Sequence, residues 1–183
     1  DQRFAYDFVV LRDGRTHAGD GRENDDYHCF GRPVLAPAPG RVVTVVDTVP
    51  ANEPGQMNGD VPPGNHVVLD HGNGEYSVIA HLRGESVAVE AGDRVDRGER
   101  LGACGNSGRS SEPHVHYHLQ TGPRFGEGVG LPARFRRYVA DGEVVERGEP
   151  IRGQLVRPAD EEAPGRGGRT GKTGTEDGRR SDA

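Results

Sequence analysis

Three histidines recur at alternate positions in one short segment. The segment PHVHYHL (113–119) contains His114, His116 and His118. On a β-strand, alternate side chains share one face, so the three imidazoles would point the same way, with neighbouring Cα atoms roughly 6.5 Å apart. At this spacing one imidazole can bind a metal ion while its neighbour reaches a water molecule or a substrate. The pattern therefore indicates metal-assisted chemistry, and the alternative is a set of strand histidines that face only water.

Two residues elsewhere in the chain favour the metal interpretation. His81 ends the strand-like segment SVIAHL, and Asp7 lies in FAYDFVVL (4–11). An acidic side chain among apolar neighbours needs a partner when it is buried. The Gly/Ser-rich turn GNSGRSSEP precedes the histidine segment and can present the start of that strand at a cleft. We therefore expect these side chains to come together from separate strands.

The elements that would position these side chains are short strands separated by turns. Segments rich in Val, Tyr and Phe alternate with Gly, Pro and Asn clusters, and no window of 11 residues shows helical periodicity. The predicted strands are 4–11, 41–49, 66–70, 75–81, 86–89 and 113–119. RFRRYVA and EVVERGEPIRG add either two more strands or an irregular closing segment. The pattern predicts an all-β domain, a compact sandwich.

Composition excludes several classes of protein. The chain has 183 residues, of which 32% are hydrophobic, with 29 glycines and 13 prolines, which argues against a helical bundle. No run approaches the roughly 20 apolar residues of a membrane span. The net charge of −6 and the absence of a long basic cluster argue against nucleic acid as the main binding partner.

The organisation of the chain follows from a change in composition near its end. Residues 159–183 contain no hydrophobic residue larger than alanine, so they cannot bury enough surface to offset the entropy of ordering. We therefore predict one folded domain over residues 1–158 and a disordered tail over residues 159–183.

Three successive blocks of the sequence resemble one protein family. GNHVVLDHGNGEYSVIAHL, SVAVEAGDRVDRGERLGACGNSG and SSEPHVHYHLQ are similar, in this order, to the lysostaphin/LytM-type zinc metallopeptidases that act on bacterial cell walls. The resemblance extends from about residue 4 to residue 120. It implies a compact antiparallel β-sandwich of the barrel-sandwich hybrid type, with long loops.

The resemblance also implies roles for four residues. His116 matches the second histidine of the family's His-x-His element, which is a zinc ligand, and His114 matches the first, which is catalytic. His81 matches the other catalytic histidine, although Ile79 stands where the family usually has an aromatic residue. Asp7 is the choice for the aspartate ligand of zinc, because its segment resembles the form found in a branch with longer loops.

The first histidine ligand of the family has no clear match. The family's usual spacing is His-x-x-x-Asp, and Arg3 stands where that histidine would precede Asp7. In the branch with longer loops the histidine lies further upstream, so we expect the chain to be truncated before Asp1. His17 and His28 are the alternatives within the chain. Other aspartates are alternatives to Asp7. His17-Ala-Gly-Asp20 has one residue fewer than the His-x-x-x-Asp spacing, and Asp25 and Asp26 lie near the family's usual distance before Gly31.

The function that the resemblance implies is zinc-dependent hydrolysis of peptide bonds in peptidoglycan, with Zn²⁺ as cofactor and a peptidoglycan peptide as substrate. The family works outside the cytoplasm, so we expect the same here, although the opening residues show no signal-peptide pattern. The alternative is an inactive binding or regulatory module that keeps the fold without a complete zinc site. Cys29 and Cys104 can form one disulfide or remain two small buried thiols.

Overall fold

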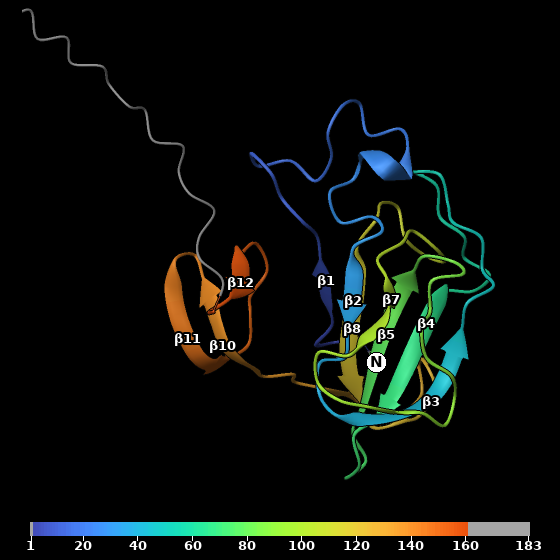
Figure 1. Cartoon of the computed structure of the whole chain (residues 1–183), viewed down its shortest axis with the longest axis vertical. Coiled ribbons are helices and arrows are strands. Elements are labelled where there is room, and N and C mark those ends of the chain that lie inside the picture. Colours follow the sequence, from blue (N-terminus) through green and yellow to red (C-terminus); the bar gives the residue numbers. More distant parts are fainter. Residues whose placement is uncertain (1, 161–183) are drawn as a thin grey trace, which may run out of the picture. The chain divides into compact units, whose positions relative to one another are not determined.

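The computed structural model describes residues 2–160, which belong to two compact units, Asp1–Ala133 and Arg134–Ala183 (Figure 1). Nearly all of the regular structure is β-strand, and the described helical structure is a single 3₁₀ turn, η1. The elements are β1 (Tyr6–Phe8), η1 (Asn24–Asp26), β2 (Pro33–Leu35), β3 (Gly40–Val46), β4 (Asn65–Asp70), β5 (Tyr76–Leu82), β6 (Arg94–Val95), β7 (Arg100–Ala103), β8 (Val115–Gln120), β9 (Gly130–Leu131), β10 (Phe135–Ala140), β11 (Glu143–Gly148) and β12 (Val156–Pro158).

The first unit is built on one antiparallel sheet. Its strands run in the order β1-β8-β5-β4-β3-β6, with β9 paired to β8, and β2 and β7 form a separate two-stranded sheet. All of the pairings are antiparallel. The predicted all-β, antiparallel fold class is therefore confirmed. In this order β8, which carries His116 and His118 and directly follows His114, lies between β1, which carries Asp7, and β5, which carries His81.

The hydrophobic core explains why the sequences of β4 and β5 contain continuous runs of apolar residues. β4 and β5 each have neighbours on both sides in the sheet, and most of their residues are buried. A strand buried on both faces lacks the alternation of polar and apolar residues found in half-exposed strands. The hydrophobic side chains with 0% of their surface exposed are Val67, Val68, Leu69, Val78, Ala80, Leu82 and Leu101.

The turn between β4 and β5 follows from the sequence HGNG. Asn73 and Gly74 both have positive φ values, of 56° and 75°. Glycine adopts this left-handed region without steric cost, and asparagine tolerates it better than most residues. The turn therefore fixes the register in which β4 pairs with β5 and, through β5, the height of His81 in the sheet.

The strand predictions were correct in most places and wrong in one. Five predicted strands of the first unit correspond to β1, β3, β4, β5 and β8. β1 (Tyr6–Phe8) is much shorter than the predicted 4–11, and the others differ by a few residues at their ends. Residues 86–89 (SVAV) do not form a strand, and only Ala88 in this stretch donates a backbone hydrogen bond to Leu101 across to β7. The β-branched composition of the segment predicted a strand, but a single backbone hydrogen bond does not make a β-ladder.

The second unit contains the two strands predicted from RFRRYVA and EVVERGEPIRG. They form β10 and β11, and β12 pairs with the other edge of β10. Asp141 and Gly142 connect β10 to β11 with φ values of 51° and 97°, as a two-residue Asp-Gly hairpin requires. The single domain over residues 1–158 stays a prediction, and the predicted tail from residue 161 onward lies outside the described residues.

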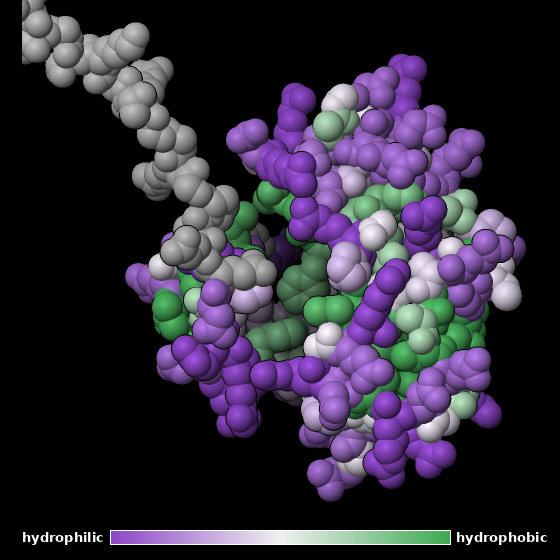
Figure 2. Space-filling model, in the orientation of Figure 1, coloured by the Kyte–Doolittle hydropathy of each residue, from purple (hydrophilic) through white to green (hydrophobic). Residues whose placement is uncertain are grey.

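The surface in view is mostly hydrophilic, with hydrophobic residues in local groups (Figure 2). Across residues 2–160, no helix has the length and apolar character needed to cross a membrane.

Candidate active site

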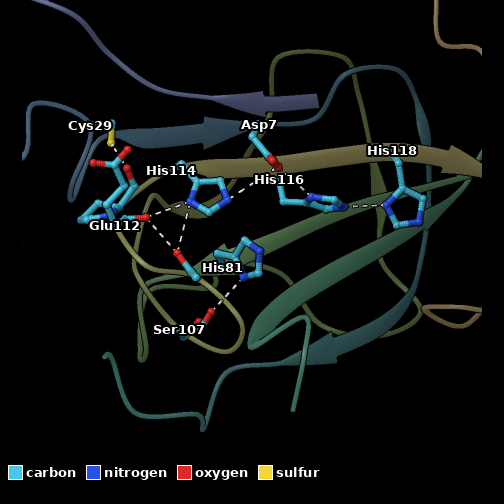
Figure 3. A network of polar contacts seen from close by, with 10 residues as sticks. Asp7, Cys29, His81, Ser107, Glu112, His114, His116 and His118 are labelled. Carbon is cyan, nitrogen blue, oxygen red and sulfur yellow. Dashed lines mark hydrogen bonds and ion pairs between the residues drawn. The ribbon is translucent and has the colours of Figure 1, made fainter. Parts of the chain in front are cut away.

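One face of β8 carries a row of polar side chains. Because side chains alternate along a strand, His116, His118 and Gln120 share a face, and Tyr117 belongs to the other. His116 is 6% exposed and His118 is 1% exposed, so neither faces open water. Figure 3 shows His116 and His118 following one another along this strand, with His114 directly before it. The predicted alternation is present, and the alternative of water-facing histidines does not describe it.

Asp7 lies directly opposite His116 in the ladder between β1 and β8. Its Oδ1 is 2.9 Å from Nδ1 of His116 and 3.6 Å from Nε2 of His114. The Asp7 side chain is solvent-exposed, while both imidazoles are largely buried. Hydrogen bonds with His114 and His116 hold the pKa of Asp7 well below its ordinary value, so the carboxylate is ionised. The sheet register thus brings one carboxylate and two imidazoles to the same place.

A β-bulge directs His81 toward the same place. The register of β4 and β5 shifts between Asn65 and Val67, where β5 carries an extra residue, and His81 has a φ of +62°. Bulges redirect side chains, and a left-handed backbone at a residue other than glycine is a source of local strain that is common at functional sites. The His81 ring centroid lies 4.7 Å from that of His114 and 5.6 Å from that of His116.

The backbone of the loop before β8 holds two of the histidines. Nδ1 of His81 is 2.8 Å from the carbonyl oxygen of Ser107, and Nδ1 of His114 is 2.8 Å from that of Glu112 (Figure 3). A carbonyl only accepts hydrogen bonds, so in both rings Nδ1 carries the hydrogen. Nε2 of His81 is then left free to take part in chemistry, while Nε2 of His114 faces the Asp7 carboxylate, 3.6 Å away.

The two histidines differ in their electrostatics. Burial lowers the pKa of His81 to about 4, assisted by the nearby His114. Burial also acts to lower the pKa of His114, but its hydrogen bonds with Asp7 and with the Glu112 carbonyl outweigh burial and raise that pKa. Near neutral pH, His81 is therefore a neutral base, while His114 holds a proton more readily. Titratable groups whose pKa values are driven apart are typical of acid and base pairs.

These side chains open onto a groove of about 710 Å³. Asp7, His81, His114 and His116 all line it. Its other lining residues are Gln2, Ala5, Met57, Pro62, Arg109, Ser111 and Phe125. The four residues singled out from the sequence are thus brought together at one accessible surface.

The remaining predicted ligands lie elsewhere. His17 packs against Tyr27 with ring centroids 5.2 Å apart, and neither His17 nor His28 lines the groove. His118 lies behind His116 and does not line the groove. Within residues 2–160, no group of three or more His, Cys, Asp or Glu side chains is arranged to hold a metal ion. Of the predicted ligands, Asp7 and His116 are the two that the structure brings together, with Oδ1 and Nδ1 2.9 Å apart.

The two cysteines are buried free thiols. The thiol of Cys29 donates a hydrogen bond to the carbonyl oxygen of Pro113, at 2.8 Å, next to His114. Of the two alternatives that the sequence left open, the structure has the pair of small buried side chains.

Several residues that position the histidines were not predicted from the sequence. Ser107 and Glu112 act through their backbone carbonyls, for which side-chain identity gives no signal. Gln120 and Phe125 surround the far end of the histidine row, and Phe125 packs against both His116 and His118. Gln120 had a usable signal, because it continues the alternate positions of the three histidines.

The lowered pKa of His81 predicts a pH dependence of stability. An unfolded histidine titrates near 6.5, so between about pH 6.5 and pH 4 the unfolded state binds more protons than the folded state. The free energy of unfolding should therefore fall as the pH drops through this window, by on the order of 3 kcal/mol from His81 alone. Above pH 6.5 this penalty is absent, and below about pH 4 it is constant.

The measurement is urea unfolding of the protein at pH 7.5 and at pH 4.5, with a chelator present throughout. His81→Gln should lose less stability between the two pH values than the unsubstituted protein. His17→Gln, which removes a histidine from the polar loop, is the control and should leave the difference unchanged. An equal acid loss in the His81→Gln variant and the unsubstituted protein would contradict the assignment.

The chain was compared with known families and curated proteins. Residues 26–126 match the sequence pattern described as Peptidase family M23. This stretch includes His81, His114 and His116 and begins after Asp7. Among curated proteins, the chain is 45% identical over 56 residues to the peptidoglycan DD-endopeptidase ShyA of Vibrio cholerae, which covers 31% of this chain and 13% of that protein. It is 37% identical over 94 residues to an uncharacterized metalloprotease of Haemophilus influenzae, covering 51% and 17%.

The chain thus matches less than a fifth of the length of these two relatives. Among solved structures, one similar fold is the catalytic domain of the prophage-encoded M23 protein EnpA from Enterococcus faecalis. It has a TM-score of 0.44 and 24% identity, and the match covers 70% of this chain and 86% of that one.

Proposed function

Because the chain belongs to peptidase family M23, we propose that it is a zinc-dependent endopeptidase that hydrolyses peptide bonds of bacterial peptidoglycan. The observation that carries the proposal is that Asp7, His81 and His116, from three neighbouring strands, meet His114, which directly precedes β8, at one groove. The relatives support the choice of substrate, since one of them is named a peptidoglycan DD-endopeptidase.

The donor atoms of the site suit zinc. A carboxylate oxygen of Asp7 and Nδ1 of His116 lie 2.9 Å apart, at the groove. Carboxylate oxygens and imidazole nitrogens are common zinc ligands, and a catalytic zinc takes three protein ligands and leaves one position open. In the proposal Asp7 and His116 hold the ion as part of that set. A bound zinc would polarise the scissile carbonyl and lower the pKa of a water molecule toward about 7.

His81 would act as the base. Its Nδ1–H is donated to the Ser107 carbonyl, so the lone pair on Nε2 is free to accept a proton from water. Its lowered pKa keeps the ring neutral near pH 7 and therefore able to accept that proton. The bulge and the carbonyl of Ser107 hold the ring in one orientation, so no reorganisation is needed during the reaction.

His114 would act as the acid, stabilising the negative charge that develops during hydrolysis. Its raised pKa favours the protonated ring, and Nε2 lies beside Asp7 at the groove. A protonated imidazole here can donate to the oxygen that becomes negative during hydrolysis and then protonate the leaving amine. The carbonyl of Glu112 and the hydroxyl of Ser110 hold its other nitrogen at 2.8 Å and 3.1 Å.

The same proposal places the protein outside the cytoplasm, where peptidoglycan is found. The relative named a peptidoglycan DD-endopeptidase supports this location.

Isolated peptidoglycan provides the test. The purified chain, loaded with zinc, should release peptide fragments that mass spectrometry identifies as products of peptide-bond cleavage. A chelator should stop the release, and added zinc should restore it. If the chain sediments with peptidoglycan but releases nothing at any zinc concentration, it is instead the non-catalytic binding module.

A further inference from the structure

A chain of hydrogen bonds runs along β8 from the candidate metal ligand into the protein. Nε2 of His116 lies 2.9 Å from Nδ1 of His118, and Nε2 of His118 lies 2.8 Å from Oε1 of Gln120. All three side chains are buried, with 6%, 1% and 0% of their surface exposed. Phe125 packs edge-on against His118, with ring centroids 5.7 Å apart. Water therefore has little access to these bonds, so the protein itself decides which atom donates in each.

Gln120 determines which atom donates and which accepts in this series of hydrogen bonds. Its side-chain nitrogen lies 2.7 Å from the carbonyl oxygen of Gly122 and 2.6 Å from that of Arg124. Both carbonyls are acceptors, so the NH₂ group of Gln120 must face them, and its oxygen must face His118. The oxygen of an amide can only accept, so Nε2 of His118 carries a hydrogen.

The tautomer of His118 in turn determines which nitrogen of His116 carries a hydrogen. With its hydrogen on Nε2, the neutral His118 ring has a lone pair on Nδ1, and burial favours the neutral ring. That lone pair accepts a hydrogen from Nε2 of His116. The Nδ1 atom of His116, on the other side of its ring, is then free to present a lone pair toward Oδ1 of Asp7.

Two electron-rich atoms 2.9 Å apart repel each other unless a positive group lies between them. A proton can take this place, and so can a metal ion that replaces the proton. We propose that His118 and Gln120 are positioning residues that hold His116 in the tautomer with hydrogen on Nε2, so that Nδ1 is the metal-binding atom. This inference rests on the proposed zinc-dependent function and assigns roles to two residues beyond the ligands and the catalytic histidines.

Zinc affinity tests the role of His118. Removing an outer-shell partner of a ligating histidine typically weakens metal binding about 10- to 100-fold. We expect a loss in this range for His118→Leu, measured by competition with a chromophoric chelator. His118→Asn keeps an oxygen near the position of Nδ1, so it should recover most of the lost affinity. His71→Leu is the matched control, because both ring nitrogens of His71 are hydrogen-bonded while the residue lies outside the groove.

Nitrogen NMR of the histidine rings tests the tautomers directly. In the zinc-loaded chain, His116 and His118 should both carry hydrogen on Nε2, and Nδ1 of His116 should show the shift of a metal-bound nitrogen. In the metal-free chain, Nε2 of His116 should still be protonated. The NMR result also decides the matter if His118→Leu fails to fold.

Three results would overturn the inference. They are unchanged zinc affinity in a folded His118→Leu variant, equal losses for His118→Leu and His118→Asn, and a His116 ring without hydrogen on Nε2. Failure of the proposed function looks different: the unsubstituted chain would bind no zinc, while the tautomer of His116 in the metal-free chain would still report on His118 and Gln120.

Discussion

Asp7→Asn is expected to weaken zinc binding more than about 100-fold, beyond the loss typical for an outer-shell partner, and to abolish hydrolysis of peptidoglycan. The substitution keeps the size of the side chain but removes the charge that faces Nδ1 of His116. Because the Asp7 side chain is exposed, the pairing of β1 with β8 should survive, and thermal unfolding should change little. His116→Ala should have the same effect on zinc, and it also removes the hydrogen-bond partner of Nδ1 of His118.

The measurements are zinc stoichiometry after dialysis and the rate of fragment release from peptidoglycan. Asp20→Asn is the matched control, since it removes a carboxylate that pairs only with Arg22 on the surface. It should keep both zinc and activity. If Asp7→Asn retained stoichiometric zinc and normal turnover, another carboxylate would have to be the ligand.

His81→Ala and His114→Ala are expected to lower kcat/KM for a peptidoglycan peptide by roughly 100- to 10,000-fold, the range typical of lost general acid–base catalysis. Zinc should remain bound in both variants, because neither residue is assigned as a ligand. The combination of lost turnover and retained metal separates these two residues from Asp7 and His116.

His114 is the more demanding case, because its Nε2 lies 3.6 Å from the carboxylate of Asp7. If His114→Ala lost its zinc, His114 would be a ligand and its catalytic role would be wrong. Unchanged turnover in either variant would refute the catalytic role of that residue. His28→Ala, a change outside the groove, is the control and should match the unsubstituted protein.

The sequence predicted the histidine face because a strand has a simple period. His114, His116 and His118 alternate, so any strand containing them places them on one side, whatever the rest of the fold does. Asp7 was found by a similar local argument, since a charge within an apolar strand needs a partner. The register that sets it opposite His116 depends on a pairing between residues more than 100 positions apart, which no local pattern encodes.

The orientation of His81 could not be predicted, because it depends on a defect in the sheet. The bulge opposite His66 and the positive φ of His81 arise from how β5 meets β4 and the loop at Ser107. A regular strand ending at His81 would have been an equally good interpretation of SVIAHL. The false strand at residues 86–89 shows the opposite error, since a suitable composition found no neighbouring strand to form a ladder.

The burial of His118 also depends on contacts that no local sequence pattern shows. Its position on the histidine face was predicted, but the sequence does not show that Phe125 and the carbonyls of Gly122 and Arg124 enclose that end of the row. Enclosure turns a residue at the edge of a cleft into a buried hydrogen-bond partner of His116.

The central claim is that Asp7 and His116 hold a zinc ion at the groove. Anomalous diffraction at the zinc absorption edge, from crystals of the zinc-loaded protein, tests it most directly. The account predicts one strong anomalous peak about 2.0–2.2 Å from both Oδ1 of Asp7 and Nδ1 of His116. A zinc peak bound by other side chains, or none at the groove under conditions in which the protein cleaves peptidoglycan, would contradict it.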